Sequence, residues 1–246
     1  LVGDKEVTAQ TTFTPDQPSG TVDVTFTFNA SSLKAKEVVV FERLYIGDAE
    51  IAVHADIEDK DQTVSFIEPK IGTKATGKDG EKQLAISKTA TIIDKVKYEG
   101  LTVGEKYTLK GTLMDKASGK ALLVNGKAVT AETTFTPEKA DGSVEVTFTF
   151  DASALAGKQV VVFERLYIGD AEIAAHADIE DKGQTVSFTE PKIRTSASGK
   201  DGEKQIAISR TATIIDKVKY EGLTVGEKYT LKGILMDKAT GKALLV

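Results

Sequence analysis

The chain has 246 residues, of which 40% are hydrophobic, enough for one large or two ordinary domains with sizeable cores. The formal net charge is −5 and lysines are interspersed with acidic residues, which argues against a nucleic-acid partner. No apolar run reaches membrane-spanning length, so no membrane partner is expected. The absence of cysteine excludes disulfide bonds and thiolate chemistry.

The sequence repeats itself with a period of 122 residues, the interval between its only two histidines, His54 and His176. Residues 1–70 recur as 123–192, and residues 71–124 recur as 193–246. A period of this length is typical of a whole domain rather than of a solenoid turn.

Pro69-Lys70 and Pro191-Lys192 have the composition of linkers between repeats. They predict one complete domain at residues 71–192. Residues 1–70 are then the C-terminal part of a preceding repeat, and residues 193–246 the N-terminal part of a following one.

Apolar and polar residues alternate along six runs of the predicted complete domain. In chain order these runs are 71–76, 90–98, 107–113, 143–150, 160–168 and 184–188. Turn dipeptides such as Asn125-Gly126 separate them, and only residues 151–157 could make a helical turn. The pattern predicts an all-β chain of immunoglobulin-like antiparallel β-sandwich domains in tandem.

Four polar side chains fall on the apolar faces of these runs: Thr73, Asp94, Glu164 and Gln184. A fifth, His176, lies in a short stretch between two runs and shares its parity with Ala174. Each alone has an ordinary explanation, as a β-former, a strand end, half of an ion pair or a packed side chain. Together they direct a hydroxyl, two carboxyls, an imidazole and a carboxamide into one core. Such a set indicates acid/base chemistry around a nucleophile and an acyl group, with raised pKa values for the buried carboxyls.

Val161-Val162-Phe163-Glu164, like Val39-Val40-Phe41-Glu42, resembles the signature of VaFE repeats. These are Thr–Gln ester-bond domains, found in tandem in surface adhesins and pilus-like stalks of Gram-positive bacteria. The family pattern also has a first-strand Thr, an Asp followed by Tyr-x-x-Leu, and a His eight residues before a Gln. The five residues named above match that pattern. Thr76 is an alternative to Thr73, but it becomes Ser198 in the next copy, whereas Thr73 is kept as Thr195.

The resemblance implies a single self-acylation rather than enzymatic turnover. The Thr73 hydroxyl would attack the side-chain carbonyl of Gln184, ammonia would leave, and an ester would join the first strand to the last. His176 would take the hydroxyl proton, and Asp94 and Glu164 would share a proton and polarise the amide oxygen. The reaction needs no cofactor and no metal.

The two incomplete ends carry the two halves of a further reactive set. Residues 193–246 hold Thr195 and Asp216, and residues 1–70 hold Glu42, His54 and Gln62. We therefore expect copies of the chain to dock head-to-tail, or neighbouring repeats to pack together, with Thr195 and Gln62 joined. The implied location is extracellular, at the surface or cell wall of a Gram-positive bacterium. Nothing in the sequence identifies a host ligand.

Four alternative interpretations compete with this one. An isopeptide bond would need a lysine and an asparagine, but Asn29, Asn125 and Lys74 do not recur in the other copy. The acidic stretch 176–181 could supply oxygen ligands for calcium. A conventional hydrolase would need an open pocket, and a ligand-binding adhesin head would not be expected in near-identical tandem copies.

Overall fold

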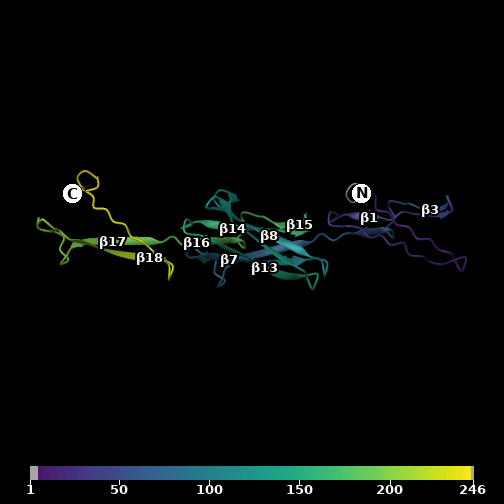
Figure 1. Cartoon of the computed structure of the whole chain (residues 1–246), viewed down its shortest axis with the longest axis horizontal. Helices are drawn as coiled ribbons and strands as arrows, with labels where there is room; N and C mark the ends of the chain where they lie inside the picture. Colours follow the sequence, from purple (N-terminus) through teal and green to yellow (C-terminus); the bar gives the residue numbers. More distant parts are fainter. Residues whose placement is uncertain (1–4, 245–246) are drawn as a thin grey trace.

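The computed structural model describes residues 5–244, in which every regular element is a β-strand. The molecule is elongated, with strands β1–β4 at one end, β5–β16 in a middle body, and β17–β18 at the other end (Figure 1). The predicted all-β class is confirmed.

The middle body contains two sheets. The larger has the order β12 (Thr130–Phe135), β8 (Tyr107–Asp115), β14 (Gln159–Ile168), β16 (Thr185–Phe188) and β6 (Gln83–Leu84). At its sides β15 (Ala171–His176) pairs with β14, and β9 (Lys120–Ala121) pairs with β8. The smaller has the order β13 (Gly142–Phe150), β7 (Ala90–Glu99) and β5 (Lys70–Gly77). A separate hairpin joins β10 (Leu123–Val124) to β11 (Lys127–Ala128) through Asn125 and Gly126, both at positive φ.

One strand pair departs from the antiparallel arrangement expected from the sequence, because β16 pairs with β6 in parallel. The two strands come from opposite halves of the repeat, so no tight turn joins them and antiparallel pairing is not imposed. The alternation predicted for the long strands does hold, as β7 changes between buried and less buried residues along its whole length.

The inward side chains of both sheets form one core. Its largest members, including Phe148 and Ile92 from the smaller sheet and Leu109 and Leu166 from the larger, are almost completely enclosed. Alternation along each strand places these residues on one face, and their burial between the sheets is the main apolar stabilisation of the body.

The helical turn expected at residues 151–157 is not present, and that expectation was wrong. Two successive four-residue turns stand there instead, closed by hydrogen bonds from Leu155 N to Ala152 O at 3.0 Å and from Lys158 N to Leu155 O at 2.9 Å. The N–H of Ala152 is already bonded to Ser87 O across the body, and Gly157 turns the chain at a φ of 70°. Leu155 N thus bonds the carbonyl three residues back rather than that of Asp151, and the positive φ of Gly157 ends the segment, so no i→i+4 ladder forms.

Both ends of the chain form fewer strands than the middle body does with a closely similar sequence. At one end β1 (Glu37–Val39) pairs with β4 (Thr63–Ser65), and β2 (Glu42–Ile46) pairs with β3 (Ala49–His54). At the other end β17 (Lys192–Gly199) pairs with β18 (Ile214–Glu221). Residues 20–28, the counterpart of β13, form no strand, because the counterpart of its partner β7 is not beside them.

The same apolar side chains are buried in the middle body and exposed at the ends. Ile92 is 0% exposed and its counterpart Ile214 is 46% exposed; Leu109 is 0% exposed and its counterpart Leu231 is 64% exposed. The ends therefore present to solvent the faces that form the core of the middle body.

Substitution of Ile92 and of its counterpart Ile214 should distinguish a buried core position from a solvent-exposed one. The test uses a Thr73→Val protein, in which the ester expected from the sequence cannot form. There, Ile92→Ala should lower the free energy of unfolding of the middle body by about 2–5 kcal/mol, because it leaves a cavity. Ile214→Ala should change it far less. Denaturant unfolding measures both, and equal losses for the two variants would contradict the assignment of the core.

Candidate functional site

Five neighbouring strands of the two sheets bring the candidate residues together. On the smaller sheet Thr73 lies in β5 and Asp94 in β7, where Asp94 pairs with Ala75, two residues along from Thr73. On the larger sheet Glu164 of β14 lies directly opposite His176 of β15. Gln184 immediately precedes β16, and its backbone carbonyl oxygen accepts a 3.2 Å hydrogen bond from Val162 N in β14.

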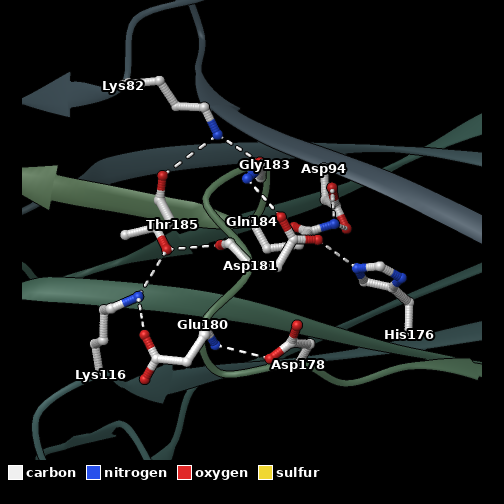
Figure 2. Close-up of polar contacts among 10 residues, drawn as sticks. All are labelled: Lys82, Asp94, Lys116, His176, Asp178, Glu180, Asp181, Gly183, Gln184 and Thr185. Atoms are coloured by element: carbon white, nitrogen blue, oxygen red, sulfur yellow. Dashed lines mark hydrogen bonds and ion pairs between the residues drawn. The ribbon is translucent and has the colours of Figure 1, made fainter.

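Three of these residues, Asp94, Glu164 and Gln184, are the fully buried polar side chains of the described chain, each with 0% exposure. Gln184 Nε2 donates to Asp94 Oδ1 at 3.3 Å and lies 3.5 Å from Oδ2 (Figure 2). Thr73 Oγ1, Gln184 Oε1 and both carboxyl oxygens of Glu164 are enclosed without a hydrogen-bond partner. Orphaned polar atoms are rare in protein cores, so a cluster of them indicates a chemical rather than a packing role.

Burial sets the protonation of the two carboxyls. Loss of solvent raises the pKa of Asp94 to about 7, against the opposing effects of His176 and of the nearby Thr73 hydroxyl. Loss of solvent, and then the charge of Asp94, raises the pKa of Glu164 to about 9. Glu164 is therefore protonated at neutral pH, beside an Asp94 that titrates there.

Asp181, considered from the sequence only as part of an acidic stretch, holds the histidine. His176 Nε2 lies 2.6 Å from Asp181 Oδ2, and Asp181 Oδ1 accepts a 2.6 Å hydrogen bond from Gly183 N, next to Gln184 (Figure 2). Partial burial raises the pKa of Asp181, but these two contacts outweigh it and the net pKa is lowered.

The first repeat contains the same contact, between His54 Nε2 and Asp59 Oδ2 at 2.6 Å, although the rest of the site is not beside it. The turn alone therefore orients the imidazole, before any site is assembled. The signal in the sequence was the His-x4-Asp spacing, which occurs in both copies.

Lys82, which was missed from the sequence, holds the backbone on both sides of Gln184. Its Nζ donates to Gly183 O at 2.5 Å and to Thr185 O at 3.3 Å, and Gly183 O also accepts from Ala75 N at 3.1 Å (Figure 2). The counterpart Lys204 donates instead to Ala197 O, within its own half-repeat. In the middle body, the lysine of the N-terminal half therefore binds the glutamine segment of the C-terminal half. In the tail, where no such segment is adjacent, the equivalent lysine binds its own half-repeat.

A second residue that was missed is Gly111, which leaves room for Glu164. The two residues are paired in adjacent strands, and a Cβ on Gly111 would overlap the Glu164 carboxyl and the Phe148 ring. The signal was a glycine in register with Leu109 and Leu113 on an inward face. At its counterpart, Gly233, an added Cβ would meet open space.

The remaining candidates are not assembled into a site. Thr195, Asp216 and His54 are exposed, and Glu42 and Gln62 are half-buried. The segments that carry them lie at opposite ends of the molecule, so they do not meet within one chain (Figure 1). Thr76 stands on the opposite face of β5 from Thr73.

The residues of two alternatives are engaged elsewhere or lie at the surface. Asn29 and Asn125 are exposed. In the acidic stretch, Asp178 Oδ1 accepts from Glu180 N at 2.9 Å and Glu180 pairs with Lys116 at 3.4 Å. Within residues 5–244 no three or more His, Asp or Glu are grouped to hold a metal ion. Over the same range, no helix has the length and apolar character to span a membrane.

Comparison with known proteins places this geometry in a family. The model of the T-Q ester bond containing domain matches residues 2–66, 69–188 and 191–244. The chain therefore belongs to this family, whose description names a cross-link rather than a turnover reaction. No curated protein matches.

Two solved structures give partial likenesses. A bacterial adhesin from Mobiluncus mulieris, described as containing intramolecular disulfide, isopeptide and ester bond cross-links, is 14% identical with a TM-score of 0.43, covering 63% of this chain and 77% of its own. A glycosyl hydrolase family 2 member from Bacteroides cellulosilyticus is 14% identical with a TM-score of 0.36, covering 66% and 18%.

Gly111→Ala should disturb the site through the Glu164 side chain. The added methyl group forces the carboxyl or the Phe148 ring to move, which should destabilise the middle body by about 1–3 kcal/mol and slow the chemistry of the site. Gly233→Ala is the matched control and should change neither. Denaturant unfolding of both variants measures this effect. Unchanged stability in Gly111→Ala would refute the close approach of Gly111 to the Glu164 carboxyl.

The raised carboxyl pKa values predict a stability that falls with increasing pH in an unlinked Thr73→Val protein. The folded state binds these protons more tightly than the unfolded chain, so the contribution is complete below about pH 4 and is lost as the pH rises through each folded pKa. For Asp94 that value is about 7 and for Glu164 about 9.

Unfolding at a series of pH values measures this effect. Glu164→Gln should flatten the upper part of the profile, and Glu42→Gln should not. A stability that rises between pH 5 and 9 would contradict the burial of unpaired acids.

Proposed function

We propose that residues 71–192 are a complete repeat that joins Thr73 to Gln184 through an ester. The observation that carries the proposal is the burial, in one enclosed site, of an unpaired threonine hydroxyl, an unpaired amide oxygen and two carboxyls of raised pKa. Because folding holds nucleophile and acyl group in one place, the high effective concentration of the pair replaces substrate binding.

The reaction balances without any added reagent. The Thr73 Oγ–Gln184 Cδ bond forms, the Cδ–Nε2 bond breaks, and the hydroxyl proton leaves with the nitrogen as ammonia. His176, held by Asp181, relays this proton. Gln184 presents its nitrogen to Asp94. Asp94 therefore serves the leaving amine, and not the amide oxygen as the sequence led us to expect. Protonated Glu164 is then left to donate to the oxyanion of the tetrahedral intermediate.

The cross-link gives the repeat a mechanical role. The link closes a loop of 111 residues, which is worth about 4–5 kcal/mol if it acts on the unfolded chain as a disulfide does. It also connects the first strand, β5, with the last, β16, so tension between repeats passes through the covalent bond. We infer a stalk or fibre segment of an adhesin at the surface of a Gram-positive bacterium, supported by the family and the tandem repeats.

Loss of the histidine should leave a folded but unlinked repeat. Wild-type protein should be lighter than its sequence by one ammonia per complete repeat. His176→Ala should slow this loss by at least about a hundredfold, because it removes the acid/base group while the apolar core stays intact. His54→Ala is the matched control. Intact mass against time measures the rate, and a His176→Ala protein that reacts as fast as wild type would refute the role.

We further propose that the open faces at the two ends are completed by another repeat, which in the 246-residue protein is a second copy. The middle body supports this proposal, because its N-terminal and C-terminal parts are closely similar in sequence to the tail (residues 193–246) and the head (residues 1–70) and pack on each other. Such a contact is heterologous and extends into a filament unless it bends into a ring. Thr195 of one copy and Gln62 of the next are then placed as Thr73 and Gln184 are.

Denaturing electrophoresis tests this assembly. A ladder of multimers that survives boiling is expected, because each junction becomes covalent. Thr195→Ala should abolish the ladder, and Thr73→Ala should retain it while removing the internal link. A single monomer band from folded protein would rule out assembly between copies.

A further inference from the structure

The contact between the middle body and the tail uses a three-residue segment, Ile86-Ser87-Lys88. Thr224 Oγ1 in the tail donates to Ile86 O at 2.5 Å, and Glu227 Oε1 accepts from Lys88 N at 3.2 Å. On the other side, Ala152 N donates to Ser87 O at 2.9 Å. This segment, from the N-terminal half of the repeat, is therefore held between its own C-terminal half and the next repeat.

The corresponding junction between the head and the middle body has the same groups but no such segment. The counterparts of Thr224, Glu227 and Ala152 are Thr102, Glu105 and Ala30. All three line a groove of about 690 Å³ together with Phe28, Phe66 and Tyr107. Among the described residues, the Thr102 hydroxyl, the Glu105 carboxylate and the Ala30 N–H make no hydrogen bond.

We propose that Ile208-Ser209-Arg210 of a second copy fills this groove. These residues are the counterparts of Ile86-Ser87-Lys88, and the Ile208 side chain is 103% exposed in the free tail. The change from lysine to arginine is without consequence for the contact, because the group used at this position is the backbone N–H.

Three hydrogen bonds define the docked segment by analogy with the occupied junction. Thr102 Oγ1 donates to Ile208 O, Ala30 N donates to Ser209 O, and Arg210 N donates to the Glu105 carboxylate. The contact rests on the proposed head-to-tail assembly and deepens it, because the incoming tail binds the middle body as well as the head. Docking therefore fixes the head against the middle body and continues the joint along the fibre.

Paired cysteines test whether residues 208–210 of a second copy bind in this groove, a contact called the seat below. The chain has no cysteine of its own to interfere. In a Thr195→Ala background, where no ester joins copies, Glu105→Cys with Arg210→Cys should give multimers on treatment with a short bismaleimide. Lys88→Cys with Glu227→Cys is the matched control, because its contact lies within one chain and should give only an internal link.

Sedimentation of uncross-linked Thr195→Ala protein gives the affinity. Thr102→Val with Glu105→Ala should weaken association by about tenfold, the effect of removing two hydrogen bonds. Thr224→Val with Glu227→Ala should leave it within about twofold, since those groups bind inside the chain.

The outcomes distinguish the seat from the assembly itself. One outcome is that protein with Thr195 forms the boiling-resistant ladder and the 88–227 cysteine pair links, but the 105–210 pair does not. In that case the seat is wrong and the head-to-tail assembly stands. If neither ladder nor linked multimers form, both proposals fail. Linked multimers together with the tenfold weakening support the seat.

Discussion

The burial of a threonine hydroxyl and a glutamine amide without enough hydrogen-bond partners is the constraint on which the rest of this structure depends. Each orphaned polar group costs roughly 1–3 kcal/mol, and the site holds several. An ester between Thr73 and Gln184 would remove one of these orphaned groups, the Thr73 hydroxyl. The proposed cross-link would therefore lower part of the free-energy cost of burying these groups.

The surrounding structure serves to keep this set enclosed and oriented. Lys82 and Ala75 fix the backbone at Gly183, and Asp181 fixes His176 through the same turn. Gly111 provides the space in which Glu164 stays dry, and dryness is what raises the pKa of that carboxyl. An enclosed site also protects the product, since an ester in contact with water is open to hydrolysis.

Strand alternation was enough to predict which polar side chains enter the core. It placed Thr73, Asp94, Glu164 and Gln184 inward, because the direction of a side chain along a strand depends only on parity. The roles of Asp181, Lys82 and Gly111 depend on partners far away in the sequence or on the path of a turn, which parity does not describe. No helical turn forms at 151–157, because Leu155 N bonds Ala152 O, three residues back, and Gly157 turns the chain.

The repeated sequence also shows how far strand formation depends on neighbours. Residues 229–237 match β8 at every position except Ile234, the counterpart of Thr112, but make only one bridge, between Met236 and Ala243, because the counterparts of β12 and β14 are not beside them. β-propensity is mainly a fit to a half-buried surface, and the ends of this chain lack that surface. In the proposed assembly, each end would supply the neighbouring strands that the other lacks.

Fragment mass spectrometry of a protease digest tests the central claim most directly. The account predicts one cross-linked species in which the peptide containing Thr73 is joined to the peptide containing Gln184, lighter by one ammonia and cleaved by hydroxylamine. Recovery of these two peptides from folded protein as separate, unmodified species would contradict it.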